Sequence, residues 1–340
     1  MPFADIIGHE REIEVLKRGI LNNRVPHAFI FAGPSGVGKR TTAVAFAKAL
    51  NCNRLSGDFC DECPDCLAID NSLFVDVFLI EPKEPEYKGG AVDHVSGTIR
   101  EEDITYIQQR LGYSSDKGNK KVSIIDGADK MNRFAQNKLL KTLEEPPLNS
   151  VIILISAHYT SLIPTVLSRC RRINFRPVRK DIISQYISDR LNISSGDADI
   201  IASLSSGSIG TALGMDREWT LNGRKQLIER FERLSIKNGD DILRFAEEVS
   251  KEEDIGDALE FLKIWYRDIA LYLKGMGDMV INLDMLPFIK KHAQVFSFEK
   301  VFTGFTAIIE AQKDIAPPRY ANKQLTMDNL FMKLLSQSQK

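Results

Sequence analysis

The stretch Phe29-Ile30-Phe31-Ala32-Gly33-Pro34-Ser35-Gly36-Val37-Gly38-Lys39 joins a short apolar strand to a glycine-rich loop that ends in Gly-Lys. This is the spacing of a phosphate-binding loop, whose backbone N–H groups point inward and hold phosphate oxygens. A helix expected over residues 41–50 would add its positive N-terminus. The stretch therefore predicts an α/β fold that presents this loop to a nucleotide.

The residues after the loop lysine depart from the usual pattern. A Ser or Thr normally follows the lysine and holds magnesium with its hydroxyl. Here Arg40 follows, and Thr41 comes one step later, turned by about 100° on a helix. We expect ATP or ADP with a weakened hold on magnesium. The alternatives are a fully competent nucleotide loop and a glycine-rich turn without a ligand. The expected nucleotide-binding residues of this segment are Gly33, Pro34, Ser35, Gly36, Val37, Gly38, Lys39, Arg40 and Thr41.

A second apolar strand, residues 122–125, runs into Asp126, which would place a carboxylate beside the magnesium. A hydrolysing enzyme of this type normally carries Glu next, to polarise the attacking water. That position is Gly127, and Asp129 would replace the missing carboxylate only if the loop bent back. The alternative is that Asp126 merely ends a strand.

Four cysteines behind the loop, Cys52, Cys60, Cys63 and Cys66, have the spacing C-x7-C-x2-C-x2-C. Tetrahedral zinc accepts four thiolates, and C-x2-C turns commonly present two of them. Four thiolates leave no open coordination position, so we expect a structural zinc site, with four free thiols as the alternative. The fifth cysteine, Cys170, is expected to be a small core residue.

Composition limits the class of protein. The 340 residues suggest two or three domains, and 45 basic against 46 acidic residues do not demand a nucleic-acid partner. No apolar run approaches the roughly 18–20 residues that span a bilayer, and the start lacks a signal-peptide pattern. An odd cysteine count then favours a reducing compartment. We expect a cytoplasmic protein without a membrane partner.

Strand-like and helix-like segments alternate in the first half, which predicts a mostly parallel sheet covered by helices on both faces. From about residue 177 the strand signals vanish and helical periodicity continues to the end. Strands are expected over residues 27–32, 74–80, 122–125, 151–156 and 172–175. Helices are expected over residues 41–50, 101–111, 132–143, 180–191, 196–205 and 209–215, followed by longer helices from about residue 221.

The segment Leu167-Ser168-Arg169-Cys170 follows a buried strand. One interpretation is a surface arginine in a basic cluster with Arg171 and Arg172. The other is an arginine presented to the phosphates of a neighbouring subunit.

These motifs, with Asn137-Lys138-Leu139-Leu140-Lys141-Thr142-Leu143-Glu144-Glu145-Pro146-Pro147, resemble the bacterial clamp-loader ATPase family, most specifically over residues 7–175. The resemblance implies an α/β AAA+ module at residues 1–176 that contains the zinc module at 52–66. It further implies a small helical lid at 177–218 and an all-helical collar at 219–340. In this family five subunits form a ring that loads the sliding clamp onto primed DNA for the replicative polymerase.

The resemblance also implies roles for single residues. Motor subunits carry a hydroxyl, a Glu and a lid arginine where this chain has Arg40, Gly127 and Gly210. The Ser-Arg-Cys motif is kept, so the chain is similar to the subunit type that supplies a trans-acting arginine, here Arg169, and hydrolyses little ATP itself. Ser156 matches the polar sensing position of the family.

The function expected is therefore that of a clamp-loader subunit in DNA replication, assembled with other clamp-loader subunits in a hetero-pentameric ring. Its expected cofactors are structural zinc and ATP or ADP with magnesium. An active motor subunit of the same ring is the first alternative, since its loop lysine is intact. A stand-alone zinc-containing protein that binds DNA and changes shape with nucleotide is the second.

Overall fold

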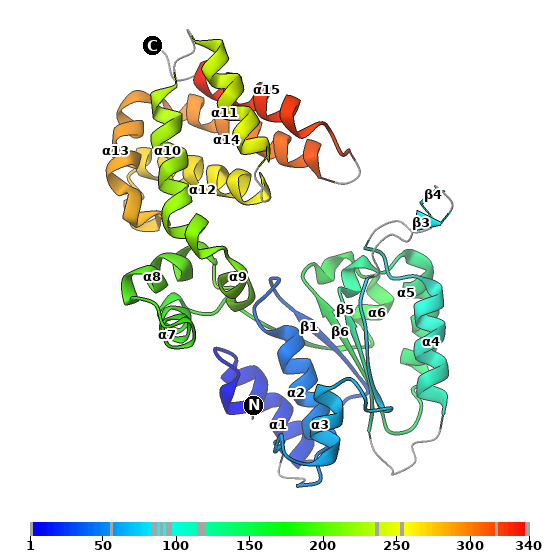
Figure 1. Cartoon of the computed structure of the whole chain (residues 1–340). Helices are drawn as coiled ribbons and strands as arrows, with labels where there is room; N and C mark the ends of the chain where they lie inside the picture. The colour runs from blue at the N-terminus through cyan, green and yellow to red at the C-terminus, as the bar shows by residue number, and fades with distance from the viewer. Residues whose placement is uncertain are drawn as a thin grey trace. The chain divides into compact units, whose positions relative to one another are not determined.

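The computed structural model describes residues 3–54, 57–82, 87–88, 91–92, 97–113, 120–234, 238–251, 255–316 and 319–336 (Figure 1). The chain divides into two compact units, and each is described by itself. The sheet unit comprises Met1–Tyr186 and Ser205–Leu213, and the helical unit comprises Ile187–Leu204 and Gly214–Lys340.

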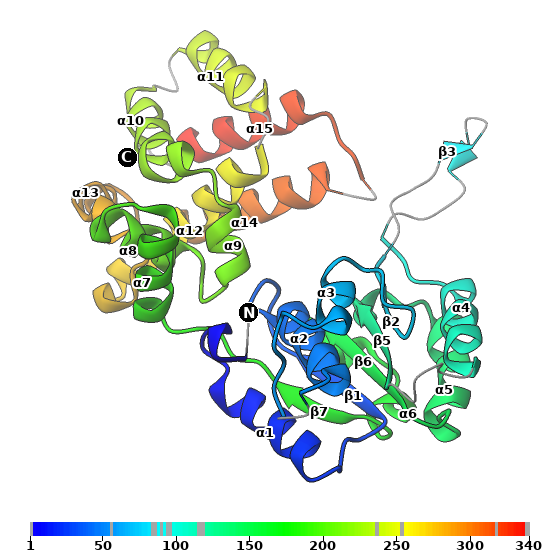
Figure 2. The same cartoon turned by 60° about the horizontal axis from the view of Figure 1, so that its bottom comes forward.

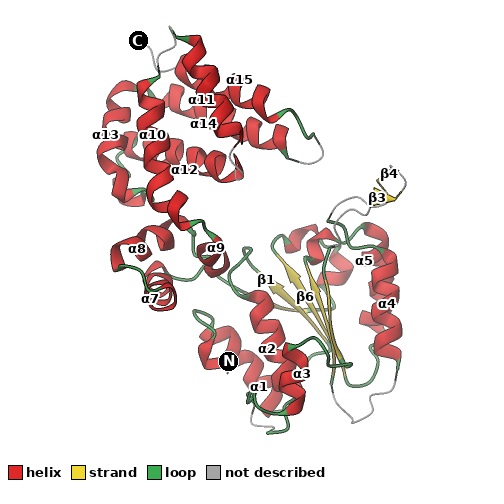
Figure 3. Cartoon of the chain, viewed as in Figure 1, coloured by secondary structure: helices red, strands yellow, loops and turns green. Residues whose placement is uncertain are grey.

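The sheet unit is built on five strands in the order β2-β5-β6-β1-β7 (Figure 2). Every neighbouring pair is parallel, so the strand arrows run one way (Figure 3). The strands are β1 (Ala28–Ala32), β2 (Val77–Ile80), β5 (Lys121–Asp126), β6 (Ser150–Ser156) and β7 (Arg171–Asn174), and a separate antiparallel pair is formed by β3 (Tyr87–Lys88) and β4 (Ala91–Val92). Because the strands are parallel, all their carboxyl ends meet at one edge.

Helices cover both faces of this sheet, as Figure 1 shows for α2 and α3 on one side and α4 and α5 on the other. Alternate residues of β1 separate the two cores: Phe29 and Phe31 pack with α1 to α3, and Ile30 packs with α4 to α6. The helices are α1 (Glu10–Leu21), α2 (Lys39–Asn51), α3 (Pro64–Asp70), α4 (Glu101–Gly112), α5 (Arg133–Glu144) and α6 (Pro164–Leu167). The predicted α/β architecture, a parallel sheet between helical layers, is confirmed.

The remaining described chain is helical, as predicted. Three helices follow the sheet: α7 (Lys180–Leu191), α8 (Ser195–Leu204) and α9 (Ile209–Gly214). The next ones are α10 (Arg224–Arg233), α11 (Gly239–Lys251), α12 (Ile255–Leu273), α13 (Leu286–Val295), α14 (Phe298–Ile315) and α15 (Lys323–Ser336). The exact division into a module, a lid and a collar stays a prediction. Within the described residues, no helix has the length and apolarity needed to cross a bilayer.

Two predicted elements differ from their expected bounds by more than one residue, each for a physical reason. Strand β2 begins at Val77 rather than at residue 74, because Leu73 and Val75 are 75% and 70% exposed and do not join the buried sheet. Helix α2 begins at Lys39, two residues before its predicted start, with Gly38 as its N-cap in a left-handed conformation. Lys39 and Arg40 therefore belong to the first turn of this helix.

In the helical unit, α12 packs along α14, and α11 along α15, around a core that includes Trp265 and Phe331. Gly304 of α14 allows this helix to pack closely against Tyr266 of α12. A Cβ atom there would lie 2.3 Å from Cε1 of Tyr266, a ring that is 3% exposed.

We predict that Gly304→Ala destabilises the protein by about 1–3 kcal/mol, because the buried Tyr266 ring must shift to admit the methyl group. The free energy of unfolding in urea measures this. Gly256→Ala is the matched control, since a Cβ at Gly256 of α12 meets no atom within 4 Å. It should be neutral or slightly stabilising, as Ala is the better helix former. Equal stability of the two variants would contradict the packing described.

Candidate functional site

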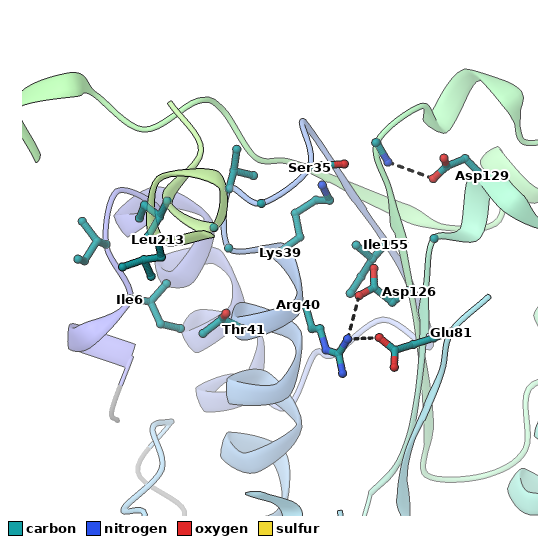
Figure 4. Close-up of a pocket in the computed structure, with 18 of the residues that line it drawn as sticks. Ile6, Ser35, Lys39, Arg40, Thr41, Glu81, Asp126, Asp129, Ile155 and Leu213 are labelled. Atoms are coloured by element: carbon teal, nitrogen blue, oxygen red, sulfur yellow. Dashed lines mark hydrogen bonds and ion pairs between the residues drawn. The ribbon is translucent and has the colours of Figure 1, made fainter. Parts of the chain in front are cut away.

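The carboxyl edge of the sheet holds a cavity of about 570 Å³ within the sheet unit (Figure 4). Its walls come from the loop after β1, the start of α2, the end of β5, residues 5–7 and parts of α7 and α9. The predicted nucleotide-binding residues that line it are Ser35, Gly36, Val37, Gly38, Lys39, Arg40, Thr41 and Asp126. Figure 4 places Ile6 and Leu213 on one side of Lys39, and Asp126 and Glu81 on the other. The cavity thus has an apolar half and a charged half.

The loop after β1 requires glycine at points of close approach. Gly33 has φ +154°, and a Cβ atom there would lie 2.2 Å from the backbone oxygen of Phe175. Gly36 has φ +71°, and its Cβ would lie 2.3 Å from Oγ of Ser208. The Gly36 carbonyl also accepts a hydrogen bond from Gly210 N at 2.8 Å. The segment that opens α9 therefore rests directly on the loop.

His9 is a site residue that sequence reasoning missed. Its ring is 1% exposed, its Nε2 donates to the Val37 carbonyl at 2.6 Å, and it packs edge-on against Phe175 with ring centroids 4.8 Å apart. His9 therefore holds the loop after β1 in place through the Val37 carbonyl. A single histidine before a helix carries no distinctive sequence signal.

The ammonium of Lys39 is held by the loop itself. Its Nζ donates to the carbonyl oxygens of Gly33 and Pro34, both at 2.6 Å. Burial lowers the pKa of Lys39, and the carboxylates of Asp126 and Asp129 oppose that shift. Gly33 and Pro34 thus contribute to the site as acceptors for Lys39 rather than as part of the cavity wall.

Arg40 occupies the charged half of the cavity. Its guanidinium forms ion pairs with Glu81, which follows β2, and with Asp126 at the end of β5, the second at 3.7 Å (Figure 4). Burial raises the pKa of Asp126, and the positive charge of Arg40 opposes the shift. Two carboxylates that would suit a divalent cation therefore already have a cationic partner. Glu81 was not predicted, because only the fold brings β2 beside β5.

The backbone at Gly127 is left-handed, with φ 75° and ψ 40°. A Cβ atom there would lie 3.0 Å from Cγ of Pro82, so a side chain meets strain and crowding together. Asp129 lines the cavity, but its Oδ1 accepts a hydrogen bond from Ala157 N at 3.1 Å. Its carboxylate is thus tied to the end of β6.

Ser156 lies beneath the loop and is not among the residues that line the cavity. Its strand neighbours Ile155 and Ala157 do line it, and successive side chains of a strand point to opposite faces. The Ser156 side chain is buried, and its Oγ has no hydrogen-bond partner within the described part of the chain. Its carbonyl accepts from Gly33 N at 3.2 Å. The structure brings Ser156 to the loop through its backbone.

Arg169 lies near the amino ends of the strands, at the edge of the sheet opposite to the cavity. Helix α6, which the sequence did not predict, lies between β6 and Arg169. The Arg169 guanidinium pairs with Glu144 at the end of α5 at 2.7 Å and donates to the Thr165 carbonyl at 3.0 Å. Strand β7 begins at Arg171 opposite Phe29, whereas the phosphate loop leaves the far end of β1. Arg169 therefore lies at the opposite end of the strands from the cavity of its own chain and does not line it.

The four predicted metal ligands converge. The Sγ atoms of Cys52, Cys60, Cys63 and Cys66 all lie within 4.8 Å of one another, and those of Cys52 and Cys60 are 3.7 Å apart. Four sulfurs at the Zn–S distance in a tetrahedron lie about 3.8 Å apart. The cluster can therefore hold one metal ion with little rearrangement.

Backbone amides support thiolates in this cluster. Cys63 N lies 3.3 Å from Cys60 Sγ, and Cys66 N lies 3.4 Å from Cys63 Sγ. The amide of Glu62 is the largest cause that lowers the pKa of Cys60 to about 6, whereas burial raises the pKa of Cys52 and Cys66. Cys170 stands apart, and burial raises its pKa to about 12. The donor set fits a soft cation that replaces the remaining thiol protons.

Comparisons with known proteins indicate the family of the chain. The family model described as DNA polymerase III, delta subunit, matches residues 8–179, and the model of the C-terminal part of that subunit matches residues 219–335. The delta' subunit of DNA polymerase III from Bacillus subtilis is 27% identical over 332 residues, which cover 95% of this chain and 95% of that protein.

Tau and gamma subunits of DNA polymerase III are also similar. The tau/gamma subunit of Haemophilus influenzae is 29% identical over 96% of this chain, and the tau subunit of Bacillus subtilis is 30% identical over 81%. The matched regions cover 49% and 51% of those two proteins. The chain thus spans about half the length of the tau and gamma relatives.

We predict one structural zinc ion per chain at the four cysteines. Elemental analysis of protein prepared without chelator should find a stoichiometric ion, and Cys60→Ser or Cys63→Ser should lose it. Cys170→Ser is the matched control and should retain it, because Cys170 lies outside the cluster. Chelation should loosen residues 50–70 and leave the sheet folded. Metal-free protein with full stability would contradict this prediction.

Proposed function

This chain belongs to the DNA polymerase III delta subunit family, and from that membership we propose that it works in DNA replication as a clamp-loader subunit of the delta-prime type. Its partners are other clamp-loader subunits in a five-membered ring, which loads the sliding clamp onto primed DNA. Within this ring the chain supplies Arg169 to the nucleotide of a neighbour. It hydrolyses little or no ATP at its own loop.

The division between the two edges of the sheet carries the proposal. At the carboxyl edge, Arg40 and Gly127 stand where a hydrolysing site needs a hydroxyl and a carboxylate. At the opposite edge, Arg169 is held by Glu144 and by the Thr165 carbonyl. An arginine that lies at the opposite end of the strands from its own cavity suits another subunit's phosphates.

The cavity still has the features of a nucleotide site. The loop amides and Lys39 suit the phosphates, and the apolar half suits a base between residues 6–7 and the α9 residues Ile209 and Leu213. Arg40 supplies positive charge beside Asp126 and Glu81. We therefore propose that ADP or ATP binds here with little need for magnesium.

The chemistry of Arg169 suits a trans-acting role. A guanidinium is always charged and has five N–H donors in a fixed plane, which match the oxygens of a phosphoryl group. The side chain is 36% exposed in its pairing with Glu144. Glu144 orients the guanidinium and leaves N–H groups for a ligand that arrives from outside the chain. As negative charge spreads over the transferred phosphoryl oxygens, such a donor stabilises the transition state.

The two alternative functions fit less well. An active motor subunit would share the relationship to the tau and gamma proteins, but it needs a water-orienting carboxylate that Gly127 does not provide. A stand-alone DNA-binding protein needs a basic surface, whereas the chain has a formal net charge of −1. In a ring, the contacts to DNA are shared among subunits. The clamp-loader proposal is compatible both with glycine at position 127 and with the net charge of −1.

We predict that the isolated chain binds ADP with similar affinity in magnesium and in EDTA, and that its ATP turnover is far below that of an assembled ring. Lys39→Ala should abolish binding, because the loop loses its central cation. Arg40→Thr should make binding depend on magnesium without restoring turnover, since Gly127 is unchanged. Isothermal titration and single-turnover assays measure both effects. Turnover by the isolated chain that matches the ring would overturn the proposal.

We predict that Arg169→Ala in a reconstituted ring lowers hydrolysis at the adjacent site by about 10³–10⁵-fold, the usual effect of removing an arginine finger. Ring assembly and nucleotide binding should persist, and clamp loading should fall. Arg171→Ala is the matched control from the same basic cluster, and it should load clamps normally. If Arg169→Ala also loaded clamps normally, Arg169 would be an ordinary surface arginine.

A further inference from the structure

The segment between Cys52 and Cys60 contains a carboxylate that joins three parts of the sheet unit. Oδ1 of Asp58 accepts hydrogen bonds from the backbone N–H of Phe3 at 3.1 Å and of Phe59 at 2.9 Å. Its Oδ2 accepts from Nζ of Lys17, on α1, at 2.6 Å. Asp58 stands two residues before the metal ligand Cys60. The cysteine cluster is therefore tied to the start of the chain.

Apolar packing reinforces the same connection. The rings of Phe3 and Phe59 meet edge to face with centroids 5.3 Å apart, and the two residues are 1% and 6% exposed. The ammonium of Lys17 lies over the Phe3 ring, 5.3 Å from its centroid. An edge-to-face aromatic pair is favourable beyond the area it buries. Phe3 is thus fixed by its backbone and by its side chain.

Phe3 is followed closely in the chain by residues 5–7, which form part of the cavity wall. Phe3 begins a single 3-10 turn, η1 (Phe3–Asp5), and Ile6 N donates to the Phe3 carbonyl at 3.2 Å. Asp5, Ile6 and Ile7 then line the cavity, the two isoleucines on its apolar side. Only one turn of chain separates the anchor from the wall, so a shift of Phe3 moves Ile6.

None of the four cysteines lines the cavity, so a metal ion in the cluster would act on it only through the protein. Lys48 of α2, 5% exposed, binds Asp61 at 2.8 Å and also pairs with Asp70. These ion pairs would keep the module attached to α2 without a metal. The link from Asp58 and Phe59 to Phe3 is supported by Lys17 of α1, but it also follows directly into the ligand Cys60, so the metal would add to the order of this segment.

We propose that the metal-bound cysteine module positions the wall formed by residues 5–7, so that nucleotide affinity depends on a metal ion that does not touch the nucleotide. This inference rests on the nucleotide binding proposed above. Asp58 and Phe59 are positioning residues that act through Phe3. The ligand is an adenine nucleotide, whose base would lie against Ile6 and Ile7.

The test uses the full chain and ADP, with metal content as a separate measurement. Asp58→Ala should keep its metal, because all four ligands remain, yet bind ADP roughly fivefold to twentyfold more weakly, the effect of losing a charge-assisted hydrogen bond. Glu14→Ala is the matched control: Glu14 pairs with the exposed Arg18 on α1, and its loss should change neither metal content nor affinity. An unchanged ADP affinity in metal-loaded Asp58→Ala would overturn the proposal.

Chelation gives a second, decisive comparison. Metal removal should weaken ADP binding in the wild type and have little further effect in Asp58→Ala, because both changes break one pathway and are not additive. Amide hydrogen exchange of residues 3–7 should accelerate on chelation, whether or not ADP binds. Unchanged exchange would refute the inference. Accelerated exchange without any ADP binding would refute only the nucleotide part of the proposed function.

Discussion

The geometry of the site depends on the close approach of two backbones at the carboxyl edge of the sheet. Phe175 N donates to the Ala32 carbonyl at 2.7 Å, and Gly33 N donates to the Ser156 carbonyl at 3.2 Å. No side chain fits at Gly33, because a Cβ atom would overlap the Phe175 carbonyl. This contact sets the direction in which the chain leaves β1. The loop, its lysine and the first turn of α2 follow from that direction.

Charge is balanced inside the site before any ligand arrives. Lys39 is satisfied by two loop carbonyls, and Arg40 by Asp126 and Glu81. A divalent cation would have to compete with a guanidinium that the chain itself supplies. Free energy used to displace the Arg40 guanidinium would not contribute to stabilising a transition state. A site of this kind suits a nucleotide with a structural role.

Sequence reasoning succeeded where the signal is local. The loop, the alternation of strands and helices, and the cysteine spacing are each defined by residues that lie close together in the sequence.

Sequence reasoning missed contacts between residues that lie far apart in the sequence. Glu81 reaches Arg40 because β2 pairs with β5, and His9 reaches Val37 across 28 positions. Helix α6 has four residues, too few for periodicity to reveal. Ser156 was assigned to the cavity, but the strand alternation turns it away.

The left-handed backbone at Gly127 has a consequence for how such a chain changes over evolutionary time. A single codon change can bring Glu to this position, but the residue would meet Pro82 and an unfavourable φ together. A carboxylate at this position would therefore require a changed turn as well as the acid itself. The low hydrolysis proposed above would then be hard to reverse by one substitution, and an engineer who wishes to turn this subunit into a motor must rebuild the turn after β5 before adding the acid.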